Sequence, residues 1–172
     1  MLVSSIIIAY NAERCLSKRL ESLKKQDYPH KNIEVILVDG MSSDNTKSLM
    51  EEFAKQNEKD FNKILVLENK GRTLPKGWNV ALKQATGEVV LRVDAHTFFD
   101  ENFITNNVKE IENGENIVGG KCISVTQGDN WKEKLLLIAE ESIFGCGIAD
   151  FRRKEEKEYV STLAFAMYRK KV

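Results

Sequence analysis

Short runs of β-favouring apolar residues alternate along this chain with segments in which apolar residues recur every three or four positions. The runs predict strands at residues 3–9, 33–38, 63–68, 88–93 and, more weakly, 117–125. The intervening segments predict helices near residues 16–23, 49–53, 77–85 and 103–111, the third closed by a left-handed Gly87. Because strands and helices alternate, we expect an α/β fold with a doubly wound, mostly parallel sheet and helices on both faces.

Length and composition narrow the functional classes. The 172 residues suit one domain with a sizeable core. Because 26 basic residues balance 26 acidic ones, no overall field would attract nucleic acid. The cysteines Cys15, Cys122 and Cys146 form no CxxC pair, so we expect reduced thiols in a cytoplasmic protein and no zinc site. No apolar run is long enough to span a bilayer.

Polar residues follow each of the first four predicted strands. They are Tyr10 and Asn11 after the first strand, Asp39 after the second, Asn69 and Lys70 after the third, and Asp94 after the fourth. In a parallel sheet these ends meet at one edge, where open α/β sheets bind their ligands. Each residue taken singly could be a turn former, since Asn and Asp are favoured in turns. The convergence of all four ends favours a nucleotide-type site.

Asp94 and His96 are spaced i, i+2 at the end of the fourth predicted strand. On a strand, this spacing points both side chains to the same side. A carboxylate and a neutral imidazole at that separation could share one divalent cation. The alternative interpretation is that Asp94 caps a turn and His96 is an ordinary surface residue.

The loops contain neither GxGxxG nor GxxxxGK, so binding of a dinucleotide or of ATP by a glycine-rich loop is poorly supported. Lys70, Arg72 and Lys76 instead place cations beside the predicted metal. A metal and cations together could neutralise a diphosphate leaving group. Each cation taken singly could also be a solvated loop charge.

Three segments resemble the signatures of family 2 glycosyltransferases. Residues 5–13 (SIIIAYNAE) resemble the opening of that family, residues 38–46 (VDGMSSDNT) its second signature, and residues 87–96 (GEVVLRVDAH) its Asp-x-Asp metal motif. Residues 92–97 are similar to the succinoglycan-type exopolysaccharide glucosyltransferases within it. The resemblance implies a GT-A nucleotide-diphosphosugar fold, with residues 1–172 as a single donor-binding domain.

The resemblance also implies roles for individual residues. The nucleotide-binding residues would be Ala9, Tyr10, Asn11, Glu13, Asp39, Lys76, Asn79 and Asp94. Asp39 would contact the uracil or ribose, and Asp94 would bridge the ribose and the metal. His96 stands where the family usually has a metal-binding aspartate, and an imidazole ligand shifts the preference from magnesium towards manganese.

The partners that this resemblance implies are a UDP-linked sugar donor and a glycan or lipid-linked acceptor. The domain would work in the cytoplasm, at the inner face of the plasma membrane if the full-length protein associates with it. Residues 131–144 form an amphipathic segment that could lie on a membrane, although packing within the protein is favoured because its polar face carries both charges. Residues 145–158 are interpreted as a mobile acceptor-side loop.

Residues 159–169 resemble a segment that in the family precedes an acidic motif, which supplies the general base for inversion. The chain reaches Val172 before any such motif. We therefore expect the base to lie beyond Val172 and the 172-residue chain to be truncated, with weak or no activity of its own. Acids nearer at hand are predicted to lie on solvated faces; they are Glu140, Glu141, Glu155, Glu156 and Glu158.

Three functions remain open from the sequence. The first is an inverting glycosyltransferase, or its donor-binding portion, that uses a UDP-sugar and a divalent metal to extend a polysaccharide or lipid-linked glycan. The second is a non-catalytic nucleotide-binding module. The third is a phosphohydrolase with Asp94 as nucleophile, but such an enzyme requires a second aspartate at the position of His96.

Overall fold

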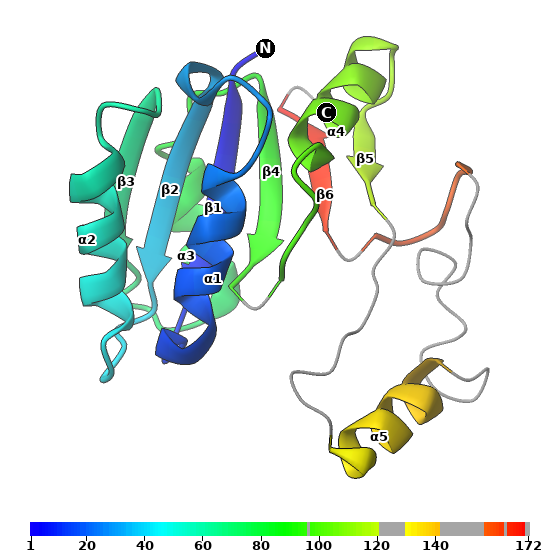
Figure 1. Ribbon diagram of the computed structural model, residues 1–172. Helices are drawn as coiled ribbons and strands as arrows, with labels where there is room; N and C mark the ends of the chain where they lie inside the picture. Colours follow the sequence, from blue (N-terminus) through cyan, green and yellow to red (C-terminus); the bar gives the residue numbers. More distant parts are fainter. Residues whose placement is uncertain (96, 121–129, 142–156, 164, 171–172) are drawn as a thin grey trace. The chain divides into compact units, whose positions relative to one another are not determined.

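The computed structural model describes residues 1–95, 97–120, 130–141, 157–163 and 165–170 (Figure 1). These residues form two compact units, one of residues 1–118 with 166–172 and the other of residues 119–165. In chain order the elements are β1 (Val3–Ala9), α1 (Glu13–Lys24), the short 3-10 helix η1 (His30–Asn32), β2 (Ile33–Asp39), α2 (Thr46–Asn57), β3 (Lys63–Glu68), α3 (Leu74–Leu82), β4 (Val89–Asp94), α4 (Phe103–Glu112), β5 (Ile117–Gly119), α5 (Trp131–Glu141) and β6 (Ala166–Arg169).

The first unit is built on a mostly parallel sheet with the strand order β3-β2-β1-β4-β6-β5. β1 pairs in parallel with β2 and β4, and β2 pairs in parallel with β3. β6 pairs antiparallel with β4. The chain therefore builds outwards from β1 to β3 and then returns to add β4 on the other side of β1. This confirms the predicted doubly wound α/β fold, with its switch point between β1 and β4.

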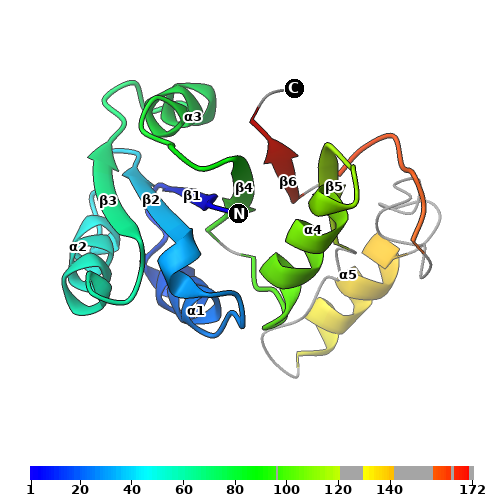
Figure 2. The same ribbon diagram turned by 90° about the horizontal axis from the view of Figure 1, so that it is seen from above.

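Helices cover both faces of the parallel strands, as the sequence predicted. Figure 2 shows α1 and α2 on one side of β1–β3 and α3 on the other. One core cluster joins alternate residues of β1, β2 and β4, such as Ile7, Leu37 and Leu91, to α1, α2 and α4. The residues between them, such as Ile6 and Ile36, pack with α3 in a second cluster. The strands are therefore buried on both faces, which explains their continuous apolar runs.

Helix α3 begins and ends earlier than the sequence predicted, at residues 74 and 82 rather than 77 and 85. Pro75 lies in its first turn, where the missing amide costs nothing. The prediction that Gly87 closes this helix in a left-handed conformation is wrong, since its φ is not positive. Gly87 is instead required because the chain passes very close to residues 2–4 at this point. A Cβ on residue 87 would lie 2.6 Å from Ser4 Oγ and 2.8 Å from the Leu2 carbonyl oxygen.

A buried carboxylate ties three segments together next to Gly87. Glu34 on β2 is fully buried and accepts hydrogen bonds from the Ser4 hydroxyl (2.6 Å), the Thr86 amide (2.8 Å) and the Thr86 hydroxyl (3.1 Å). Lys63 Nζ lies 3.6 Å from it. Burial raises the pKa of Glu34, but these hydrogen bonds and Lys63 outweigh that effect and hold the pKa below its ordinary value.

The end of the sheet was not predicted from the sequence. Residues 166–169 form β6, which lies between β4 and β5. The weak strand predicted at residues 117–125 is formed at residues 117–119, and residues 121–129 lie outside the described part of the chain. In the second unit, α5 exposes four large apolar side chains: Trp131, Leu135, Leu136 and Ile138. No helix in the described ranges is long and apolar enough to cross a membrane.

Candidate functional site

The carboxyl ends of β1, β2 and β4 bring two predicted carboxylates to the switch point. Ala9 pairs with Asp39 on β2, and Ile8 pairs with Asp94 on β4. Since neighbouring strands lie about 4.8 Å apart, the two aspartates flank the end of β1. Their side chains take opposite faces of the sheet, because Leu37, two residues before Asp39, packs on the α1 side and Val90, four residues before Asp94, packs on the α3 side.

Asp39 organises the loop that follows β2. Its side chain is only 2% exposed. Its carboxylate accepts hydrogen bonds from the amides of Met41 (3.1 Å) and Ser42 (3.2 Å). Met41 has a φ of 67°, a conformation that a residue with a side chain adopts only where its surroundings enforce it. Asp39 therefore supports the loop from beneath and determines its shape.

The loops after β1 and β2 are joined by reciprocal hydrogen bonds. The Asn11 amide donates to Ser42 Oγ (3.0 Å), and the Ser43 amide donates to Asn11 Oδ1 (2.9 Å). One turn further on, the Asn45 amide donates to the Glu13 carboxylate (3.0 Å). Glu13 is thus engaged with the neighbouring loop. Asn11 and Tyr10 are exposed, and Tyr10 has 61% of its surface accessible.

Asp44 reinforces the same junction. Its carboxylate accepts hydrogen bonds from the amides of Thr46 (3.0 Å) and Glu13 (3.2 Å), and the Thr46 hydroxyl accepts from the Ala12 amide (2.8 Å). Desolvation opposes ionisation, but hydrogen bonds from Thr46 and from the Glu13 amide lower the pKa of Asp44. This hydrogen-bond network was not predicted as a site from the sequence. The sequence feature that could have indicated it is the run of hydroxyl and amide side chains at residues 42–46.

Backbone conformations also mark this edge of the sheet. Three described non-glycine residues have a positive φ: Asn11 (48°), Met41 (67°) and Arg72 (55°). They lie in the loops after β1, β2 and β3 respectively. Such conformations cost on the order of 1–3 kcal/mol each and cluster at ligand sites. Three of them at the carboxyl edge make these loops a candidate ligand site.

The third loop leads into α3, which carries the remaining predicted nucleotide residues. Asn69 is buried, donates to the Thr73 carbonyl oxygen (2.8 Å) and accepts from the Gly71 amide (3.2 Å). This turn delivers the chain to the start of α3. Lys76 and Asn79 follow in its first turns and are exposed. The cations Lys70 and Arg72 are exposed in the loop itself.

The predicted metal ligands are only partly described. Asp94 is half-buried at the last position of β4. The Thr97 amide donates to the Asp94 carbonyl oxygen (3.1 Å), so the chain leaves the extended conformation directly after the strand. His96 lies outside the described residues. Within the described part of the chain, no group of three or more His, Cys, Asp and Glu side chains could hold a metal.

A metal that needs few protein ligands still fits this edge. Mg²⁺ and similar ions are commonly held by one or two carboxylates together with substrate phosphates and water. Asp94 supplies one such carboxylate at the carboxyl end of β4, where it is half-buried. Of the five glutamates predicted to lie on solvated faces, Glu158 is exposed, and the side chains of the other four lie outside the described residues.

Comparison with known proteins decides the family. The model of the glycosyl transferase family 2 matches residues 4–172. The chain belongs to glycosyl transferase family 2. The resemblance seen in residues 5–13, 38–46 and 87–96 is thereby confirmed, and with it the GT-A fold.

Two similar proteins are named as transferases that act on poly(ribitol phosphate) and on a dolichyl-linked sugar phosphate. The chain is 31% identical over 163 residues to the poly(ribitol-phosphate) β-N-acetylglucosaminyltransferase TarS of Staphylococcus aureus, covering 95% of this chain and 25% of TarS. It is 32% identical over 107 residues to a dolichyl N-acetyl-α-D-glucosaminyl phosphate 3-β-D-2,3-diacetamido-2,3-dideoxy-β-D-glucuronosyltransferase of Methanococcus voltae, covering 62% of this chain and 33% of that enzyme. The chain thus spans a quarter to a third of these relatives.

Solved structures agree on the fold. A structure of TarS residues 1–349 from S. aureus in complex with UDP has a TM-score of 0.59 and 28% identity, over 76% of this chain and 40% of that one. The mannosyltransferase PcManGT of Pyrobaculum calidifontis, in complex with GDP-mannose and Mn²⁺, has a TM-score of 0.67 over 98% of this chain and 44% of that one. At 22% identity, that second likeness supports the fold alone.

Proposed function

We propose that this domain binds the donor of an inverting glycosyltransferase, a UDP-sugar, with a divalent metal at the carboxyl edge of the sheet. The observation that carries the proposal is the flanking of β1 by Asp39 and Asp94 at the switch point, below three loops held in unusual conformations. The UDP complex of TarS supports the choice of nucleotide.

Individual residues receive distinct roles in this proposal. Ala9, Tyr10 and Asn11 line the nucleoside side, and Glu13 fixes the loop beside it. Asp39 contacts the base or ribose and also holds the loop after β2 in place. Lys76 and Asn79 face the diphosphate and sugar from α3. Asp94 and His96 would hold manganese or magnesium, and a bound metal would supply positive charge that stabilises a diphosphate leaving group.

The names of the relatives guide the choice of acceptor. One relative acts on poly(ribitol phosphate) and the other on a dolichyl-phosphate-linked sugar. We infer that the protein to which this domain belongs extends a polysaccharide or lipid-linked glycan, as in exopolysaccharide biosynthesis. It would draw its donor from the cytoplasm, at the membrane face. The base that deprotonates the acceptor hydroxyl would come from polypeptide outside these residues.

Calorimetry with UDP tests the donor site directly. We expect UDP to bind residues 1–172 more tightly in manganese than in EDTA, because the metal offsets the diphosphate charge beside Asp94. ATP and ribitol are the matched negative ligands. Equal UDP affinity in manganese and in EDTA would contradict the metal site, and an absence of UDP binding in both would favour an assembly module without a nucleotide site.

Replacing Asp39 and His96 one at a time separates their roles. Asp39→Ala should weaken UDP binding by about 1–3 kcal/mol even in EDTA, because the amides of Met41 and Ser42 lose their acceptor and the loop relaxes. His96→Ala should remove chiefly the manganese-dependent part. Asp60→Ala, an exposed acid before β3, is the control. Equal losses for the Asp39 and His96 variants in both buffers would show that the roles are assigned wrongly.

A further inference from the structure

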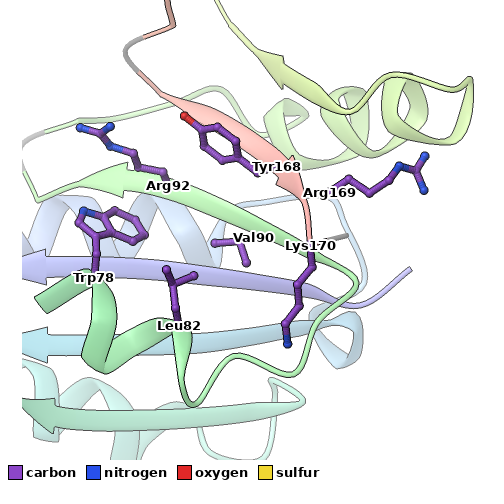
Figure 3. A pocket seen from close by; sticks show the side chains of 7 residues that line it. All are labelled: Trp78, Leu82, Val90, Arg92, Tyr168, Arg169 and Lys170. Carbon is purple, nitrogen blue, oxygen red and sulfur yellow. The ribbon is translucent and has the colours of Figure 1, made fainter. Parts of the chain in front are cut away.

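A pocket opens on the α3 side of the sheet, between α3, β4 and β6. It has a volume of about 370 Å³, which falls within the range of small-ligand sites (Figure 3). Trp78 and Leu82 of α3 form one wall, Val90 of β4 forms the floor and Tyr168 of β6 faces it. Tyr168 pairs directly with Val90 across the β4–β6 ladder. The two aromatic rings therefore belong to elements that only the tertiary fold brings together.

The charged residues that line this pocket are all cations: Arg92, Arg169 and Lys170. Two of them are engaged elsewhere. Arg169 donates to the Ile111 carbonyl oxygen, and Figure 3 shows its side chain directed away from the pocket. Lys170 Nζ donates to the Ala85 carbonyl oxygen at 2.5 Å. Arg92 is therefore the cation that remains to meet a ligand.

Arg92 has an unmet hydrogen-bonding requirement. Its Nε atom is buried and has no acceptor within the described part of the chain. The guanidinium lies 5.9 Å from the centroid of the Trp78 ring, a cation–π contact that offsets part of this cost. A buried donor without an acceptor is unfavourable, so an anionic acceptor for the guanidinium would be stabilising here. An arginine fork suits carboxylate and phosphate groups in particular.

The pocket adjoins the candidate donor site. Arg92 and Asp94 stand at alternate positions of β4, so both side chains take the α3 face, about 6.6 Å apart along the strand. A ligand in the pocket would therefore lie within reach of a donor held at Asp94.

We propose that this pocket binds an anionic sugar, with its carboxylate or phosphate on Arg92 and its ring between Trp78 and Tyr168. The apolar C–H face of a sugar ring packs well on an aromatic side chain, and Arg92 meets the charge. The choice of sugars as ligands rests on the proposed function, whereas the need for an anion rests on Arg92 alone. The anion could belong to a uronic acid on the donor or to a sugar phosphate on the acceptor.

The indole N–H signal of Trp78 in an NMR spectrum of ¹⁵N-labelled protein reports on the pocket. Trp78→Phe identifies that signal, since Trp131 gives the other one. Ribitol 5-phosphate and glucuronate are the anionic probes, and ribitol and glucose are their neutral counterparts. We expect the anions to shift the Trp78 signal and the neutral compounds to leave it in place. Equal shifts from charged and neutral probes, or no shift from any, would overturn the proposal.

Variants assign the effect to Arg92. Arg92→Gln should weaken anion binding by about 10- to 100-fold, the loss expected for a charge-assisted hydrogen bond. Arg92→Lys should retain part of the affinity. Lys109→Gln, which removes a positive charge from the exposed face of α4, should retain all of it. If Arg92→Gln unfolds the protein, calorimetry on Trp78→Leu replaces it, and undiminished affinity there would contradict the pocket.

Two further titrations identify the source of the anion and keep this proposal separate from the donor site. If UDP-glucuronate binds more tightly than UDP-glucose and Arg92→Gln abolishes this preference, the pocket binds the donor sugar. A Trp78 shift from ribitol 5-phosphate that persists when UDP is bound assigns it to the acceptor. If UDP fails to bind while ribitol 5-phosphate still shifts Trp78, the proposed donor function fails and the pocket stands.

Discussion

Residues 1–172 are expected to bind a UDP-sugar and yet transfer its sugar to an acceptor negligibly, with at most slow hydrolysis to UDP. Inverting transfer needs a base at the acceptor hydroxyl, and two of the described acids at the carboxyl edge are engaged otherwise. Asp39 holds the amides of Met41 and Ser42, and Glu13 holds that of Asn45. Loss of a general base costs about 10²- to 10⁴-fold in rate, and loss of acceptor positioning adds to this.

Measuring UDP release and sugar transfer in parallel tests this expectation. A longer protein that contains this domain and the acidic motif of its family should transfer sugar to a glycan or lipid-linked acceptor under the same conditions. The same longer protein with Asp94→Asn is the control for the donor site. Transfer by residues 1–172 at the rate of the longer protein would show that one of the glutamates at 140, 141, 155, 156 or 158 serves as the base.

Glu34→Ala is expected to lower the free energy of unfolding by about 2–4 kcal/mol, one of the larger single-residue effects in this fold. The substitution leaves the hydroxyl of Ser4, which is fully buried, and the amide and hydroxyl of Thr86 without their acceptor. Urea unfolding measures the change. Glu58→Ala, at the exposed end of α2, should stay within about 0.5 kcal/mol. If Glu34→Ala lowered the free energy of unfolding by as little as Glu58→Ala does, water would be replacing the carboxylate.

The same carboxylate makes stability depend on pH. Its pKa in the folded protein lies below the ordinary value of 4.5. The ionised form therefore stabilises the fold fully above about pH 4.5, and this contribution is lost as the pH falls through the folded pKa. The gap in unfolding free energy between the natural protein and Glu34→Gln should be widest near neutral pH and narrow as the pH falls below the ordinary pKa of 4.5. A gap that does not change with pH would contradict this.

Local pattern predicted the elements well where neighbours in sequence decide the structure. The third strand runs from Lys63 to Glu68 as predicted, because the apolar run is bounded by turn residues on both sides. The prediction failed at Gly87, where a local rule favoured a helix cap. The absence of a side chain there serves a close crossing with Ser4, which is 83 positions away, so no window of neighbouring residues contains the reason.

Strand β6 illustrates the same limit. Residues 166–169 carry little strand signal of their own, and they become a strand because the edge of β4 offers unpaired amides and carbonyls. That pairing brings Tyr168 beside Val90 and so completes the wall of the Arg92 pocket. Arg92 lies within residues 87–96, which resemble the metal motif of the family, but nothing in the sequence indicated that its Nε would lack an acceptor.

The sequence by itself determined which polar side chains follow the strands, because a strand ends where its apolar run meets turn-forming residues, and that is a short-range property. Only the tertiary structure decided which strands are neighbours and which face each side chain takes. Asp39 came to lie beside Ala9 and to turn into its own loop, while Asp94 came to lie beside Ile8 on the α3 face. Those outcomes depend on long-range pairing within the sheet and on the helices that bury it, since each strand is apolar on both faces and leaves its register to be set by its partners.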